Sequence, residues 1–144
     1  MTFRKWKYED VLKIAELEVA CFSDPWNYRM FAESFSSNFS YGVVAEEGGE
    51  VVAYALETIL FETAEIQNVA VAEAYRRKGI AEKLMELLEK EAFDRGAENS
   101  LLEVRVSNAP AMRMYLKRGY VGMFARKKYY PDGEDTLIMK KVLR

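Results

Sequence analysis

Apolar and polar residues alternate along most of this chain with the periods expected of strands and amphipathic helices. Residues 41–46 and 51–60 are rich in β-branched and aromatic residues, and the Glu47-Gly48-Gly49-Glu50 segment between them predicts a tight hairpin turn. Residues 64–71 continue as a third strand. From 80 to 92 the apolar residues recur at helical spacing. The centre of the chain is therefore predicted to form a three-strand meander followed by a helix.

Regular structure is predicted at both ends of the chain as well. Pro25 disfavours helix at the residue before it, so one helix is expected on each side of it. The remaining predicted elements are a strand at 2–6, helices at 8–21 and 28–35, a strand at 100–106, a helix from Ala109 to about Arg118, and strands at 120–128 and 136–142.

The strand, helix and strand between 64 and 106 imply a parallel pair joined by a right-handed crossover. Hairpins surround this unit on both sides. We therefore predict an α/β fold, with a mostly antiparallel mixed sheet, a central parallel pair and about four flanking helices. A length of 144 residues suits one domain with one core, so 1–144 is predicted to be a single domain.

Composition excludes several classes of protein. No apolar run approaches the roughly 20 residues that span a bilayer, and the first twenty residues mix charged with apolar side chains. We expect a cytoplasmic protein with no membrane partner. The net charge of −2 does not favour binding of nucleic acid over a whole surface, so no direct nucleic-acid partner is expected. The oligomeric state is not indicated by the sequence.

The absence of histidine restricts the chemistry that the chain can perform. Cys21 is the only cysteine, and there is no histidine, which excludes Ser–His and Cys–His catalysis and the usual zinc sites. No metal is predicted. A general base must be a carboxylate, a tyrosine, a lysine, Cys21 or a water held by one of these.

The most informative stretch lies between 67 and 88. A β-branched run ends at Val71, a basic triplet follows, and Gly79 opens the predicted helix. Free N–H groups gather where a helix begins, and a residue without Cβ lets a phosphate approach the main chain. The pattern predicts an anion site. A basic turn before a helix is also often only solvated surface, and the residues alone leave both interpretations open.

The segment Arg76-Arg77-Lys78-Gly79-Ile80-Ala81 resembles the Q/R-x-x-G-x-G/A motif of the GCN5-related N-acetyltransferases, which hold the pyrophosphate of acetyl-coenzyme A at such a helix start. Further segments resemble the RimI type of this family. They are L-E-V-R-V-S-N at 102–108, M-Y-L-K-R-G-Y at 114–120, and R-K-K-Y-Y at 126–130 with Glu134-Asp135. The resemblance covers almost the whole chain. It implies acetyl transfer to the N-terminal α-amine of a small-subunit ribosomal protein.

The resemblance implies two catalytic residues. Glu103 matches the general base of the RimI type, which acts directly or through water. Read without the resemblance, it is a strand residue that pairs with Arg105 or faces solvent. Tyr115, on the helix after Asn108, matches the general acid that returns a proton to the leaving thiolate, and a phenol with an ordinary pKa near 10 can do this. The alternative is a core tyrosine beside Gly119.

The resemblance also implies a coenzyme site and an acceptor groove. Asn108 would hydrogen-bond the pantetheine arm, although it could equally cap a helix. A main-chain N–H within Val69–Val71 would stabilise the oxyanion. The coenzyme set is Val69, Ala70, Val71, Arg76, Arg77, Lys78, Gly79, Ile80, Ala81 and Asn108. The acceptor set is Trp26, Tyr130 and Glu134. Trp26 more simply covers an edge of the core, and residues 126–130 read alone are a charged strand end.

As the acetyl acceptor, an α-amine suits a carboxylate base better than the side-chain amine of a lysine. The ordinary pKa of a peptide α-ammonium is about 7.7–8.0, against about 10.4 for lysine, so its proton is removed more easily. Direct transfer is expected because no histidine is present to activate Cys21 as a nucleophile. Two alternatives remain: the same fold acting on a lysine, a polyamine or an aminoglycoside, and a coenzyme-binding regulatory module without turnover.

Overall fold

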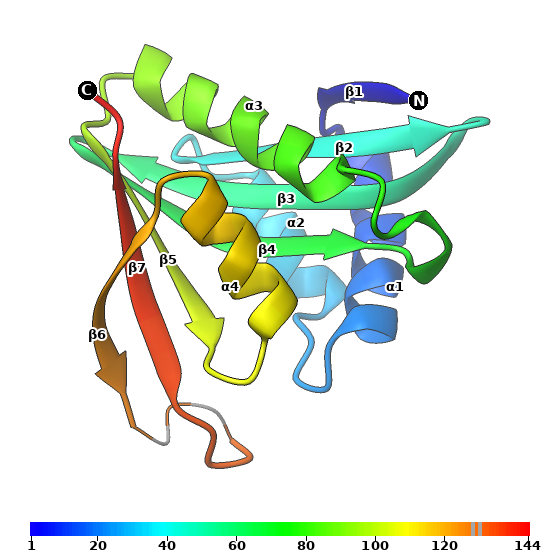
Figure 1. The fold of residues 1–144 in the computed structure, drawn as a ribbon. Helices are drawn as coiled ribbons and strands as arrows, with labels where there is room; N and C mark the ends of the chain where they lie inside the picture. Colours follow the sequence, from blue (N-terminus) through cyan, green and yellow to red (C-terminus); the bar gives the residue numbers. More distant parts are fainter. Residues whose placement is uncertain (128, 130) are drawn as a thin grey trace.

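The computed structural model places seven strands in one sheet with helices packed on both faces (Figure 1). It describes residues 1–127, 129 and 131–144. The helices are α1 (Val11–Cys21), α2 (Tyr28–Phe35), α3 (Ile80–Asp94) and α4 (Ala109–Lys117), with short 3-10 turns at Tyr8–Asp10 and Glu73–Tyr75. The strands are β1 (Thr2–Lys5), β2 (Ser40–Glu47), β3 (Glu50–Leu60), β4 (Thr63–Val71), β5 (Asn99–Arg105), β6 (Val121–Arg126) and β7 (Thr136–Val142).

The strands follow the order β1-β2-β3-β4-β5-β7-β6 across the sheet. Only β4 and β5 are parallel, and every other neighbouring pair is antiparallel. The parallel pair arises because α3 carries the chain across one face of the sheet between the two strands. The predicted fold class, a mixed sheet with a central parallel pair and flanking helices, is confirmed.

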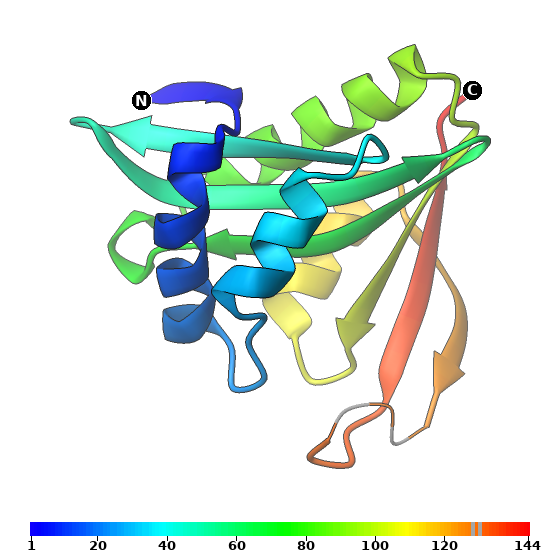
Figure 2. The ribbon, with the colours of Figure 1, turned by 180° about the vertical axis from the view of Figure 1, so that it is seen from behind.

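Strand β3 is buried on both faces because helices cover both sides of it. Its side chains alternate: Ala53 and Ala55 pack in the cluster that contains α3, whereas Tyr54 and Leu56 pack with α1 and α2. Figure 1 shows α3 and α4 in front of the sheet, and Figure 2 shows α1 and α2 on the opposite face. The chain thus builds two cores separated by one sheet.

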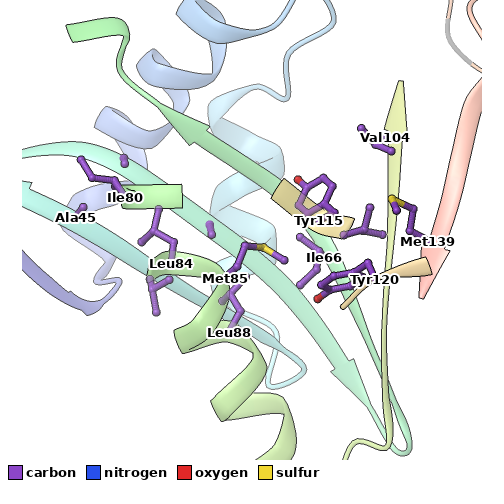
Figure 3. Packing of buried hydrophobic residues seen from close by; sticks show 14 of the residues in the cluster. Ala45, Ile66, Ile80, Leu84, Met85, Leu88, Val104, Tyr115, Tyr120 and Met139 are labelled. Atoms are coloured by element: carbon purple, nitrogen blue, oxygen red, sulfur yellow. The ribbon is translucent and has the colours of Figure 1, made fainter. Parts of the chain in front are cut away.

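The larger core lies under α3 and α4 (Figure 3). Leu84, Met85 and Leu88 project from one face of α3 and are fully buried. Tyr115 of α4 lies in the same layer as Tyr120 and Met139 of the C-terminal half. Burying a leucine side chain contributes about 1.5–3 kcal/mol, so this layer holds the α3 and α4 side of the molecule together.

The hairpin between β2 and β3 has the predicted turn. Gly48 and Gly49 have φ angles of 58° and 84°, which suit a two-residue turn whose central residues are both left-handed. Glycine reaches these angles without the steric cost that other residues meet there. The predicted hairpin is confirmed at these positions.

The strand predicted at 120–128 is wrong at its ends. Tyr120 precedes β6 and is only 1% exposed, because its hydroxyl is hydrogen-bonded to Ser100 Oγ at 2.9 Å and to Glu89 at 3.1 Å. Strand β6 ends at Arg126, and Lys128 lies outside the described residues. The strand predicted at 100–106 is Asn99–Arg105, with Val106 exposed beyond it. No helix in the described residues has the length and apolar character to cross a membrane.

Candidate active site

The sheet opens between its two parallel strands. Strands β4 and β5 pair over three residues, from Thr63 with Asn99 to Glu65 with Leu101, and separate beyond that point (Figure 1). On its other edge β4 shifts register against β3, where Gln67 is the extra residue. A bulge increases strand twist and bends the strand. The bulge therefore lies where β4 turns away from β5.

Separation of the strands leaves main-chain groups of β4 without a ladder partner. Ala72 N–H donates to Val52 C=O at 2.8 Å, and alternate residues of an antiparallel strand face the same neighbour. Ala70 therefore also faces β3, while Val69 and Val71 direct their main-chain groups toward the gap. The Val71 carbonyl accepts from Arg76 Nε at 2.9 Å. The N–H groups of Val69 and Val71 face the opening between the strands.

The start of α3 forms a concave set of N–H groups. Arg77 has a φ angle of 63° and Gly79 one of 78°, both left-handed, and Gly79 is the residue that precedes the helix. The first helical bond runs from Lys83 N–H to Gly79 C=O at 3.2 Å. Within the described part of the chain, the N–H groups from Arg77 to Glu82 have no protein acceptor. Such a nest of amides at a helix start fits a phosphate group.

The basic triplet does not present three equivalent cations. Arg76 turns back toward β4, where its guanidinium donates to Val71 C=O and to Cys21 Sγ, the latter at 3.5 Å. Lys78 Nζ lies 5.3 Å from the centre of the Tyr75 ring. Ile80 is buried in the larger core and Ala81 is partly buried, so they anchor the first turn of the helix. Arg76 therefore also braces the loop.

Glu103 lies on the half-exposed face of β5. The strand alternates, with Leu102 and Val104 buried on one side and Glu103 on the other. Its Oε1 lies 3.2 Å from Arg126 Nη1 of β6, and its side chain is 23% exposed. Of the alternative interpretation, pairing with Arg105 or exposure to solvent, the partial exposure is present, and the ion pair within the described residues is with Arg126. Arg105 instead contacts Asp132 at 2.8 Å and Glu134 at 3.1 Å, because its neighbours in space come from the turn between β6 and β7.

Tyr115 lies on α4 against the side of the sheet that carries α3. It is 8% exposed, and its ring packs edge-on against Tyr120 with centroids 5.9 Å apart. Figure 3 shows it beside Val104 of β5, the strand that also bears Glu103. The packing expected of a core tyrosine is therefore present at this position. The acid role of the Tyr115 hydroxyl stays a prediction.

The remaining predicted residues lie around the opening or outside the described residues. The Asn108 side chain accepts from Ala111 N–H at 3.3 Å, so it caps α4. Trp26 is partly buried and packs on Phe31 with ring centroids 5.2 Å apart, as expected of a side chain covering a core edge. Glu134 is held by Arg105. Tyr130 lies outside the described residues.

Comparison with known proteins identifies the family. The model of the acetyltransferase (GNAT) family matches residues 11–120. The chain belongs to this family. The ribosomal protein bS18-alanine N-acetyltransferase of Escherichia coli is 34% identical over 118 residues, which cover 80% of this chain and 79% of that protein. The N-alpha-acetyltransferase of Saccharolobus solfataricus is 32% identical over 155 residues, covering 99% of this chain and 93% of that protein.

A solved structure has the same architecture. The crystal structure of the ribosomal-protein-S18-alanine N-acetyltransferase from Escherichia coli matches with a TM-score of 0.92 and 30% identity, covering 99% of this chain and 93% of that one. The resemblance read from the sequence motifs is confirmed at the level of the family. The N-acetyltransferase fold and the opening between β4 and β5 thus occur together in this chain.

The predicted site residues did not include Glu18, Cys21 or Asn68, although all three form hydrogen bonds at or beside β4. Cys21 was considered only as a base or nucleophile, and Asn68 gave no signal of its own in the sequence. Glu18 did, because Val11, Ile14, Ala15 and Glu18 follow the i, i+3, i+4, i+7 pattern of a buried helix stripe. A carboxylate at the last position of an otherwise apolar stripe is costly unless it is hydrogen-bonded. In the structure Glu18 is 2% exposed.

Proposed function

We propose that this acetyltransferase moves the acetyl group of acetyl-coenzyme A directly to the N-terminal α-amine of a protein. The first candidate is the N-terminal alanine of a small-subunit ribosomal protein, and the cytoplasm is then the place of action. The observation that carries the proposal is the opening between β4 and β5. The amides of Val69 and Val71 face it from one strand, and Glu103 lies two residues beyond the last paired residue of the other.

The coenzyme fits the free amides of β4 and α3. Its diphosphate would be held by the N–H groups between Arg77 and Glu82, where two left-handed residues turn the amides to one side. The pantetheine arm would follow the unpaired edge of β4, and Asn108 would hydrogen-bond it. Bound in this way, the coenzyme supplies an acetyl thioester to the opening. Positive charge at Arg77 and Lys78 adds to the field of the helix start.

Two protons leave the α-ammonium nitrogen and one is delivered to the leaving thiolate, so one proton is released overall. Glu103 takes a proton from the α-ammonium, directly or through water, and the neutral nitrogen attacks the thioester carbonyl. A C–N bond forms, the nitrogen gives up its second proton to water, and the C–S bond breaks. The N–H of Val69 or Val71 would donate to the carbonyl oxygen as it gains negative charge. The Tyr115 hydroxyl would return a proton to the leaving thiolate, and the product is an acetylated N-terminus with free coenzyme A.

An α-amine is preferred as the acceptor for two reasons. Its proton leaves at a pKa about 2.5 units below that of lysine, which suits a carboxylate base. Both named relatives act on α-amino groups according to their names. Trp26, Tyr130 and Glu134 are proposed to border the acceptor peptide. The pair between Glu134 and Arg105 supports this, since it ties the β6–β7 turn to the strand that carries Glu103.

A panel of amines tests the acceptor. The protein is incubated with acetyl-coenzyme A and short peptides that differ at the first residue, and thiol release is followed. We expect acetylation at the N-terminus, with an alanine-first peptide among the best substrates. Acetylation of lysine side chains, polyamines or aminoglycosides in place of every N-terminus would overturn the proposal. Tight coenzyme binding without transfer to any amine would point instead to a regulatory module.

Substitution tests the two catalytic roles. Glu103→Gln and Tyr115→Phe are each expected to lower kcat by about 10²-fold or more, because each removes a proton acceptor or donor. Coenzyme affinity should persist in both variants. Glu98→Gln and Tyr8→Phe are matched controls, since they make the same changes at exposed positions outside the opening, Glu98 lying just before the paired end of β5. Full activity of the Glu103 and Tyr115 variants would assign these residues to structure alone.

A further inference from the structure

Glu18 is a buried carboxylate in α1 with no cation beside it. Its side chain is 2% exposed, and in the part of the chain that the structure describes no lysine or arginine forms an ion pair with it. Burying a carboxylate is costly unless hydrogen bonds replace its hydration. Such a group at the end of an apolar helix stripe needs a compensating set of donors.

Donors from three other segments meet this carboxylate. The main-chain N–H of Trp26 donates to Oε2 at 3.0 Å. The Asn68 side-chain amide donates to both oxygens, at 3.1 and 3.0 Å, and the Tyr54 hydroxyl donates to Oε1. An amide N–H and an Asn NH₂ can only donate, so Glu18 must accept at both oxygens.

Two of these donors belong to segments that the proposed function uses. Asn68 lies between the bulge residue Gln67 and Val69, the first residue whose N–H faces the opening. Trp26 lies in the connection between α1 and α2, which is proposed to border the acceptor. Val71, at the end of the same stretch of β4, is also tied to this helix through Cys21, whose Sγ lies 3.7 Å from the Val71 carbonyl oxygen. One carboxylate thus fixes the bulged part of β4 and the α1–α2 connection to each other.

We propose that Glu18 is a positioning residue for acetyl transfer. It holds the α1–α2 connection and the bulged segment of β4 at the separation in which the acceptor peptide enters and the β4 amides meet the thioester oxygen. This inference rests on the proposed function, and it adds a residue that contacts neither substrate. The Tyr54 hydroxyl, from a strand buried on both faces, fixes the carboxylate itself against the sheet.

Glu18→Gln tests the proposal with little change of shape. Asn68 Nδ2 donates to both oxygens of Glu18, so whichever oxygen the new NH₂ group replaces, Asn68 loses one of its two hydrogen bonds and meets a second donor there. We expect kcat/KM for the peptide to fall by about 10²-fold, since small displacements at a reacting centre have effects of this size. The dissociation constant of coenzyme A should change by less than about twofold, because its main contacts are at the start of α3.

Asp10→Asn is the matched control. Asp10 is a buried carboxylate immediately before the same helix, 6% exposed, and it accepts from Lys7 N–H at 2.7 Å and from the Arg4 guanidinium at 2.8 and 2.9 Å. Its loss should lower the melting temperature as the Glu18 substitution does, without changing kcat/KM for the peptide. Equal kinetics in the two variants would overturn the positioning role and leave Glu18 as a contributor to stability only.

Two further measurements test the anchoring by Glu18. If Glu18→Gln fails to fold, Asn68→Ala removes only the β4 donor and should give the same loss of kcat/KM; an unchanged value would overturn the proposal. Hydrogen exchange of the Trp26 N–H can be measured without an acetyl-accepting peptide, and we expect it to be at least about tenfold faster in Glu18→Ala, which has no acceptor for this N–H, than in the wild type. Should the wild type acetylate no N-terminus, the proposed function fails, while unchanged exchange at Trp26 would still refute the anchoring by Glu18.

Discussion

The ion pair between Glu103 and Arg126 joins the proposed base to the edge strand of the sheet. Arg126 is half exposed and Glu103 about a quarter exposed, at a separation of 3.2 Å. Pairs this open to solvent contribute about 0.2–1 kcal/mol and weaken as salt rises. The guanidinium therefore orients the carboxylate without holding it irreversibly, and water or the acceptor amine can take its place.

Replacing Arg126 should accordingly have a small effect that depends on salt. We expect Arg126→Gln to lower kcat by no more than about fivefold at low ionic strength, with the difference shrinking toward 0.5 M NaCl. Lys127→Gln removes the same charge from the neighbouring position and should leave kcat unchanged. Steady-state rates at two salt concentrations measure this. A loss as large as that of Glu103→Gln would mean that Arg126 itself takes part in the reaction.

Single residues also mark where prediction from sequence stops. The character of Glu103 as a lone carboxylate in an apolar strand is visible in L-E-V-R, because the side chains of a strand alternate. Its partner is not, since Arg126 comes from a strand that is separated from β5 by β7. For Asn108 the sequence left a cap and a coenzyme contact open. The cap is present, and the coenzyme contact remains a prediction.

At the scale of elements, the start of α3 depends on backbone conformation more than on side chains. A Cβ added at Gly79 would meet nothing within 4 Å, so the position has room for one. Its φ angle of 78° is what disfavours any other residue. Gly96, at the far end of the same helix, has a φ angle of 95° and similarly open surroundings. Gly79 precedes the first turn of α3, and Gly96 follows its last turn.

This pair gives a matched test of the phosphate site. Gly79→Ala and Gly96→Ala should each destabilise the fold by about 1 kcal/mol, because alanine is strained at positive φ. Only Gly79→Ala should weaken coenzyme A binding, by about tenfold, as its strain reorients the amides that hold the diphosphate. Calorimetric titration measures the affinity and thermal denaturation the stability. Equal coenzyme affinity in both variants would contradict the assignment of these amides.

Most helices and strands could be predicted because their signals are local. Periodicity, the glycines at 48 and 49 and the proline at 110 are enough to find α3, the hairpin and the start of α4. The opening between β4 and β5 is different. It depends on the extra residue Gln67 and on the end of pairing at Glu65, and nothing in the apolar pattern of residues 64–71 distinguishes a bulged strand from a regular one.

At the scale of the whole molecule, the crossover rule made the parallel pair predictable. The position of β7 between β5 and β6 could not be predicted from the sequence. Another feature that only the folded molecule reveals is Glu57 of β3. It is fully buried beneath α3, and within the described chain neither carboxyl oxygen has a hydrogen-bond partner. The pKa of Glu57 is raised to about 9, mainly because burial removes its hydration. The negative charges of Glu91 and Glu89 also raise this pKa, and the positive charge of Arg95 opposes them.

A raised pKa makes stability depend on pH in a defined direction. The native state holds the Glu57 proton up to about pH 9, whereas the unfolded chain releases it near its ordinary pKa of about 4.3. The native state therefore binds more protons across this window. The contribution of Glu57 to stability is fully present below about pH 4.3 and is lost progressively as pH rises to about 9.

Glu57→Gln should remove this dependence, because glutamine resembles the protonated acid and cannot ionise. We expect the variant to be more stable than the wild type above about pH 5, by a margin that grows until about pH 9, and the two to converge near pH 4. Thermal denaturation across pH 4 to 9 measures the margin, and other carboxylates cancel in the difference between the two proteins. Glu50→Gln, at the exposed start of the same strand, should show no such trend. A margin independent of pH would mean that Glu57 is already ionised in the native state.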